Sequence, residues 1–181
     1  AVTSVGTDPK NGRLLQEHTC ESQNTSPPLV WEGVPPAAQS LALVLDGPAS
    51  YDGGARRAHW VVYSIPANVS ELAAGQPATE VLEIGAKQGT NDFDGSGYSG
   101  PCPTPNIIYT GSYDNLQPPE PAQEQKYVVR LYALDMEVDL ALGISRNALM
   151  AEIDGHIVAA GELALPYKTR LRKVIQGPST P

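Results

Sequence analysis

The chain has 181 residues, a length that suits one domain with a well-buried core. Its formal net charge of −8 comes from 20 acidic against 12 basic side chains and would repel phosphate backbones, so we expect no nucleic-acid partner. No apolar run approaches the roughly 18 residues of a membrane-spanning helix, and we expect no transmembrane segment. With 17 glycines and 17 prolines, the chain is rich in turns and favours a mostly β fold with few helices.

Three apolar segments in the first half of the chain predict strands. The segment PPLVWEGVPP, residues 27–36, sets a short apolar run between proline pairs, and since proline cannot donate to a sheet we expect an edge strand there. SLALVLD, residues 40–46, is apolar almost throughout and too short for a stable helix, which predicts a buried central strand. HWVVYSIP, residues 59–66, has the same character and ends at a proline.

The second half predicts two more strands around one helix. KYVVRLYALD, residues 126–135, alternates so that Tyr127 and Val129 share one face of a strand. SRNALMAEIDG, residues 145–155, offers Ser145 as an N-cap and Gly155 as a C-terminal stop, which predicts a helix. HIVAAGELALPY, residues 156–167, then returns as a strand.

The chain has two cysteines, Cys20 and Cys102. An even count suits one disulfide formed in an oxidising compartment, which would favour a periplasmic or secreted protein. Two separate buried thiols fit the count equally well and would be compatible with the cytoplasm. The pairing and the location therefore stay open at the level of sequence.

Sequence patterns typical of catalysis or metal binding are weak. The chain has no G-x-S-x-G motif, and Cys102 lies between two prolines without the basic neighbours that lower the pKa of a thiol. No pair of His, Cys or Asp shows ligand spacing, so we expect no metal and no cofactor. TNDFDGSG, residues 90–97, lacks the closing glutamate of a calcium loop, and we interpret it as a turn-rich loop. We assign no catalytic residue.

His59 is the strongest single candidate for a binding residue. It opens a predicted buried strand beside Trp60, and strand ends commonly present polar groups to a pocket. A hydrogen-bonded histidine with a purely structural role explains the same position.

Six motifs occur in an order that resembles the phosphatidylethanolamine-binding proteins, most closely the bacterial and archaeal YbhB/YbcL, or Raf kinase inhibitor-like, branch. They are SPPLVW, SLALVLDGPAS, HWVVYSIP, GAKQGTNDFDGSGYSGPCPTP, QKYVVRLYALD and GHIVAAGELALPY. The resemblance spans roughly residues 15–170, so residues 1–14 are expected to form an N-terminal extension and residues 171–181 a tail. It implies a large central antiparallel sheet, packed with a smaller sheet and a few short helices.

The family resemblance also implies a small anion pocket at one end of the sheet. Prolines stiffen the GYSGPCPTP loop, residues 97–105, so little entropy remains to be lost when its amides face a ligand. By resemblance, the ligand-binding residues are His59, Trp60, Tyr98, Ser99, Gly100, Pro101, Pro103, Gln125 and Tyr127, with Asp46 as a substitute for a missing acid.

Several of the implied pocket positions depart from the family pattern. Gly47 and Ala49 stand where relatives have acids, and Gln125 and Lys126 stand where relatives have His-Arg. Glutamine donates a hydrogen bond without a positive charge, and charge-assisted bonds are roughly twice as strong as neutral ones. We therefore expect weak phosphate binding.

Three hypotheses about function follow. The first is a non-enzymatic protein that uses a degenerate or retuned pocket to bind a small polar or weakly anionic ligand, or a protein partner. The second is an enzyme in which His59 is a general acid or base, with Tyr127, Gln125 or Tyr98 holding the substrate. The third is a structural or inhibitory subunit of a protein complex.

Overall fold

The computed structural model describes residues 1–4, 6–48, 56–93, 95–102 and 124–168. Over these ranges the protein is mostly β, with two antiparallel sheets, one α-helix and one 3-10 turn, η1 (Gln16–His18). This confirms the fold class predicted from composition and from the family resemblance. Within the described residues, no helix is long and apolar enough to cross a membrane.

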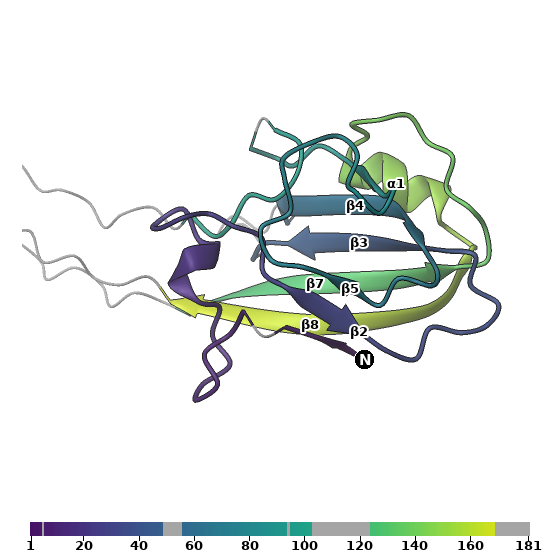
Figure 1. Cartoon of the computed structure of the whole chain (residues 1–181). Helices are drawn as coiled ribbons and strands as arrows, with labels where there is room; N and C mark the ends of the chain where they lie inside the picture. Colours follow the sequence, from purple (N-terminus) through teal and green to yellow (C-terminus); the bar gives the residue numbers. More distant parts are fainter. Residues whose placement is uncertain (5, 49–55, 94, 103–123, 169–181) are drawn as a thin grey trace, which may run out of the picture.

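The larger sheet has five antiparallel strands in the order β6-β4-β3-β7-β8 (Figure 1). Its central strand, β3 (Ser40–Asp46), is buried at all seven positions, as its continuous apolar sequence predicted. The other members are β4 (Ala58–Pro66), β6 (Lys87–Gln88), β7 (Glu124–Leu134) and β8 (Ile157–Lys168).

The smaller sheet has three short strands in the order β1-β2-β5, namely β1 (Val2–Thr3), β2 (Leu29–Trp31) and β5 (Glu71–Leu72). The prediction that residues 27–36 form an edge strand is wrong, because β2 pairs on both sides. The flanking prolines lie outside the paired residues, so they remove no donor from either ladder. Residues 2–3 pair with β2.

The hydrophobic core lies on both faces of the larger sheet. One apolar cluster fills the space between the two sheets and includes Leu29, Trp31, Leu43, Leu45, Trp60, Leu72, Tyr127, Val129 and Leu165. A second cluster on the other face packs Val44, Val61 and Tyr63 against Leu149 and Ile153. These last two belong to helix α1 (Arg146–Glu152) and its C-cap, and the side chain of Ser145 caps the helix by accepting from the amide of Ala148, as predicted.

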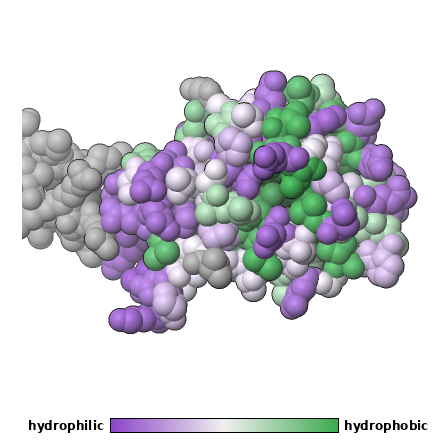
Figure 2. Space-filling view, viewed as in Figure 1, coloured by the Kyte–Doolittle hydropathy of each residue, from purple (hydrophilic) through white to green (hydrophobic). Residues whose placement is uncertain are grey.

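Apolar residues also reach the surface on the face shown in Figure 2. There they form a band over the region of the smaller sheet, with polar residues on either side. Val30 of β2 is 41% exposed and contributes to the apolar surface of that sheet.

A β-bulge interrupts the larger sheet where β3 ends and β4 begins. Leu45 pairs with Trp60 and Asp46 pairs with Ala58, so His59 is the extra residue on β4. A bulge leaves one residue outside the ladder and re-aims its side chain. Since β7 starts at this same end of the sheet, His59 is placed where the three strands and their loops meet (Figure 1).

Candidate functional site

His59 and Ser99 exchange two hydrogen bonds that fix the imidazole. The Nδ1 atom of His59 lies 2.6 Å from the carbonyl oxygen of Ser99, and the amide of Ser99 donates to the carbonyl of His59 at 2.8 Å. A carbonyl oxygen can only accept, so Nδ1 carries the proton. In the neutral ring, Nε2 is then a hydrogen-bond acceptor.

Aromatic and apolar groups surround the imidazole of His59, a residue that is 4% exposed. The Phe93 ring lies 4.6 Å from it, centroid to centroid, and the Tyr127 ring lies 5.1 Å away, edge-on. Gly47 packs against the Nε2 edge so closely that a Cβ there would come within 2.7 Å of Nε2. These contacts exclude water from most of the ring.

Burial lowers the pKa of His59 below its ordinary value. The hydrogen bond with Ser99 and the charges of Asp46 and Asp92 act in the opposite direction but do not outweigh the desolvation. His59 is therefore a neutral imidazole near pH 7, with its acceptor atom Nε2 directed toward Gly47.

Two segments that are distant in sequence hold the loop that carries Ser99. The Tyr98 hydroxyl donates to the carbonyl of His18 at 2.5 Å, and the Gly100 amide donates to Oδ1 of Asn24 at 2.8 Å. The amide of Cys20 donates to the Pro101 carbonyl at 3.1 Å. These bonds join residues 98–101 to the chain around residues 18–24.

Cys20 and Cys102 form a disulfide in the same place. The sequence left open whether the two cysteines are paired, and in the structure they are. The predicted site residue Pro103 lies outside the described residues.

Tyr127 and Gln125 lie next to each other on β7, with the Tyr127 hydroxyl 3.3 Å from Oε1 of Gln125. Burial, with a smaller contribution from Tyr167, raises the pKa of Tyr127 to about 12, so its phenol stays protonated at neutral pH. Burial also raises the pKa of Tyr98. Both phenols are therefore hydrogen-bond donors rather than charged groups.

Trp60 supports the site from the core. It is fully buried, its ring lies edge-on to Tyr98 at 5.7 Å, and its Nε1 donates to Oε1 of Gln88 at 2.6 Å. Because its only polar atom is bonded within the protein, Trp60 positions Tyr98 and the start of β4.

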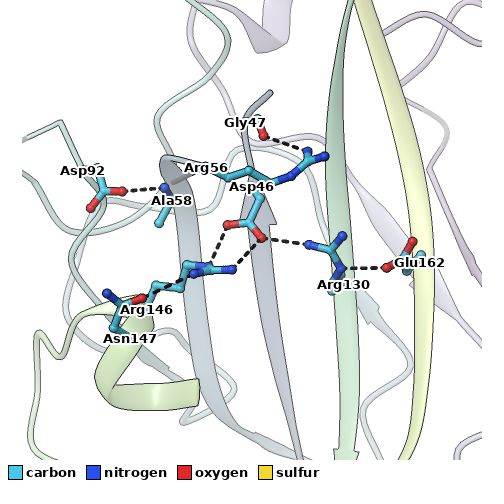
Figure 3. Close-up of polar contacts among 9 residues, drawn as sticks. All are labelled: Asp46, Gly47, Arg56, Ala58, Asp92, Arg130, Arg146, Asn147 and Glu162. Atoms are coloured by element: carbon cyan, nitrogen blue, oxygen red, sulfur yellow. Dashed lines mark hydrogen bonds and ion pairs between the residues drawn. The ribbon is translucent and has the colours of Figure 1, made fainter. Parts of the chain in front are cut away.

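Asp46 points to the face of the sheet opposite the Tyr127 ring. It follows Val44 on the side of the second apolar cluster, and its carboxylate is held by two arginines (Figure 3). Arg146 Nε lies 2.8 Å from Oδ1, and Arg130 Nη1 lies 2.9 Å from Oδ2. Arg130 is bonded in turn to Glu162 at 2.7 Å. Asp46 thus acts on His59 through its charge, with no hydrogen bond between the two side chains.

Sequence reasoning missed three contributors to the site. Phe93, the only phenylalanine in the chain, covers the imidazole, although its segment was interpreted only as a turn-rich loop. Asn24 anchors Gly100, and no local pattern pointed to it. Arg130 could be found as a cation in the middle of an otherwise apolar run, which signals an acidic partner.

No group of three His, Cys, Asp or Glu side chains that could hold a metal ion occurs within the described ranges. The polar groups near His59 include two phenols, an amide and backbone groups. Charged groups flank them: Arg56 donates to the Gly47 carbonyl at 3.1 Å, Arg57 lies over the Phe93 ring, and Asp92 accepts from the Ala58 amide at 2.7 Å. Such a set suits hydrogen bonding to a small polar molecule.

Comparisons with known proteins agree with this fold. A family model described as phosphatidylethanolamine-binding protein matches residues 5–109. The chain belongs to the phosphatidylethanolamine-binding protein family. A protein of Methanothermobacter thermautotrophicus described as a UPF0098 protein is 35% identical over 158 residues, which are 87% of this chain and 91% of the relative. A UPF0098 protein of Aquifex aeolicus is 34% identical over 162 residues, covering 88% of this chain and 84% of the relative.

Two solved structures are similar over nearly their whole length. The homologue CT736 from Chlamydia trachomatis has a TM-score of 0.72 and 30% identity, with 93% of this chain and 97% of that chain covered. Escherichia coli YbcL, described as a member of the mammalian family, has a TM-score of 0.73 and 28% identity, with 93% and 98% covered. The resemblance identified from the sequence motifs is thereby confirmed.

Proposed function

We propose that this protein is a non-enzymatic binding protein whose site, centred on His59, has been retuned toward small polar ligands that donate a hydrogen bond. The observation that carries the proposal is the bond between Nδ1 and the Ser99 carbonyl, because it makes Nε2 an acceptor in the neutral ring. A hydroxyl, amine or amide N–H can donate to Nε2, whereas an ionised carboxylate, which has no proton to give, cannot.

The charge around the imidazole supports the same ligand class. Burial keeps His59 neutral, and the nearest acids, Asp46 and Asp92, add negative potential. Gln125, at a position where the family resemblance implies a histidine, brings no positive charge. An anion would therefore meet an acceptor atom on an uncharged imidazole, which disfavours its binding to the ring at neutral pH.

A binding role fits the chemistry of the site better than proton transfer. A general acid or base works best with a pKa near the working pH, and burial moves the pKa of His59 away from that range. The Tyr127 phenol, with a pKa near 12, is equally poor as an acid.

We extend the proposal to location. The disulfide between Cys20 and Cys102 supports an extracytoplasmic protein, periplasmic or secreted, since such bonds persist in oxidising compartments.

The test is a titration of protein labelled with ¹⁵N-histidine, followed by the ring signals of His59 at pH 7.5. The probes are acetamide as a neutral donor, acetate as its anionic counterpart, and inorganic phosphate. At pH 7.5 we expect acetamide to shift the His59 signals, while acetate and phosphate do not. When the pH is lowered and the ring gains its second proton, we expect acetate to bind. The variant His59→Ala should lose the acetamide response, with His156→Ala as the matched control. Micromolar binding of phosphate at pH 7.5 would refute the proposal.

A further inference from the structure

We infer that the Cys20–Cys102 disulfide is a redox latch that regulates the His59 site. The bridge closes the loop that holds Ser99, and Ser99 holds the imidazole. Reduction would release this loop and loosen the imidazole. The inference takes the ligand site at His59 from the proposed function and adds to it a means of control.

The path from the bridge to the imidazole is short and continuous. Cys102 follows Pro101 and Gly100, which are bonded to Cys20 and Asn24 respectively. The next residue back along the chain is Ser99, whose backbone carries both hydrogen bonds to His59. Only two residues, Gly100 and Pro101, therefore separate Cys102 from Ser99, which orients the imidazole.

Close packing couples the two loops tightly. A Cβ at Gly100 would lie 2.2 Å from the carbonyl oxygen of His18 and 2.8 Å from Oδ1 of Asn24. The loop carrying Ser99 is thus pressed against the segment that bears Cys20. Because there is no free space between them, a movement of one segment must displace the other.

The bridge is accessible to a reductant, because Cys20 and Cys102 are both exposed residues. A thiolate of a dithiol reductant attacks one of the two sulfurs, which forms a mixed disulfide and releases the other cysteine as a thiolate. The second thiol of the reductant then displaces the remaining cysteine. Two electrons and two protons pass to the protein, giving two thiols, and the reductant becomes a disulfide.

Once reduced, the loop keeps its hydrogen bonds but loses its covalent constraint. The bonds at Tyr98, Gly100 and Pro101 then oppose its movement away from residues 18–24. Coupling between a regulatory site and a binding site is commonly worth about 5- to 150-fold in affinity. We expect reduction to weaken acetamide binding about 5-fold or more.

The experiment compares oxidised and dithiothreitol-reduced protein, both labelled with ¹⁵N-histidine. The chain has three histidines, so each ring can be followed separately. We expect reduction to shift and broaden the ring signals of His59, while those of His156, which is exposed and paired with Asp135, stay unchanged. The double variant Cys20→Ser/Cys102→Ser should reproduce the reduced spectrum without reductant.

The outcomes separate the latch from the proposed ligand. An unchanged His59 spectrum after reduction would overturn the latch even if acetamide binds. Loss of the His156 signals together with those of His59 would also overturn it, since the disulfide would then stabilise the whole fold rather than the His59 site. A shift of the His59 signals without a change at His156, in a protein that binds no probe, would support the latch and count against the proposed function alone.

Discussion

His59 and Ser99 lie 40 residues apart in the chain, yet two hydrogen bonds join them. One bond joins the Ser99 amide to the His59 carbonyl, and the other joins the imidazole to the Ser99 carbonyl. Together they set the position, the orientation and the tautomer of the ring. The chemistry proposed for the site rests on this pair.

Replacing Asp46 with asparagine should destabilise the protein by about 3 kcal/mol, because it leaves two arginines without their shared buried carboxylate. It should also lower the pKa of His59 further, since the charge of Asp46 raises it. Chemical denaturation and histidine NMR titration measure the two effects. Glu162→Gln is the matched control: Glu162 contacts the same Arg130 but is 61% exposed, and we expect a loss below about 1 kcal/mol. Equal losses in the two variants would contradict the role given to Asp46.

Substituting Gly47 with alanine should displace the imidazole. The added methyl would come within 2.7 Å of Nε2 and 3.0 Å of Cδ2, so the ring or the backbone must move, at about 1–3 kcal/mol. Thermal unfolding and the His59 ring signals report the change. Gly95→Ala serves as control, since its nearest neighbour would lie 3.7 Å away. If Gly47→Ala left the His59 signals in place, the close packing of Gly47 on the ring would be disproved.

Removal of the Phe93 ring should open the imidazole to solvent. In Phe93→Ala we expect the pKa of His59 to rise toward its ordinary value of about 6.5 and its acylation by diethyl pyrocarbonate to become faster. The lost aromatic contact should cost about 1 kcal/mol. Leu142→Ala, at a residue 45% exposed and outside the site, should change neither property. An unaltered acylation rate in Phe93→Ala would show that Phe93 does not shield the ring.

The lowered pKa of His59 predicts an acid-sensitive fold. The unfolded chain binds a proton at about pH 6.5, whereas the folded protein binds it only at lower pH, so acid favours unfolding. Below about pH 6.5, His59 should therefore reduce stability by up to about 1.4 kcal/mol per pH unit, until the folded pKa is passed. His59→Asn, whose amide can still donate to Ser99, should flatten this part of the pH profile, while His156→Asn should not. Identical slopes for wild type and His59→Asn between pH 7 and 5 would contradict the shift.

Much of the fold was predictable because its signals are local. The continuous apolar run of β3 and the Ser145 cap of α1 each depend on neighbouring residues, and both predictions are confirmed. The position of β2 within its sheet was not predictable in this way. It depends on pairing with Thr3 and with Glu71, which are remote in sequence.

The candidate site was likewise predictable only in part. The family motifs located His59, Ser99 and Tyr127, and the structure brings these three together. Asp46 was expected as a substitute acid, but strand alternation turns it to the other face, where Arg130 and Arg146 bind it. The direction of a side chain at a bulge and its partners on neighbouring strands depend on the tertiary structure. They could not be predicted from this single sequence.

The most direct test of the central claim is the tautomeric and protonation state of His59, read from long-range ¹H–¹⁵N couplings of its ring at pH 7.5. The structure predicts a neutral imidazole with its proton on Nδ1 and an unprotonated Nε2. A proton on Nε2, or a doubly protonated ring at that pH, would contradict the account of the site as an acceptor for neutral polar ligands.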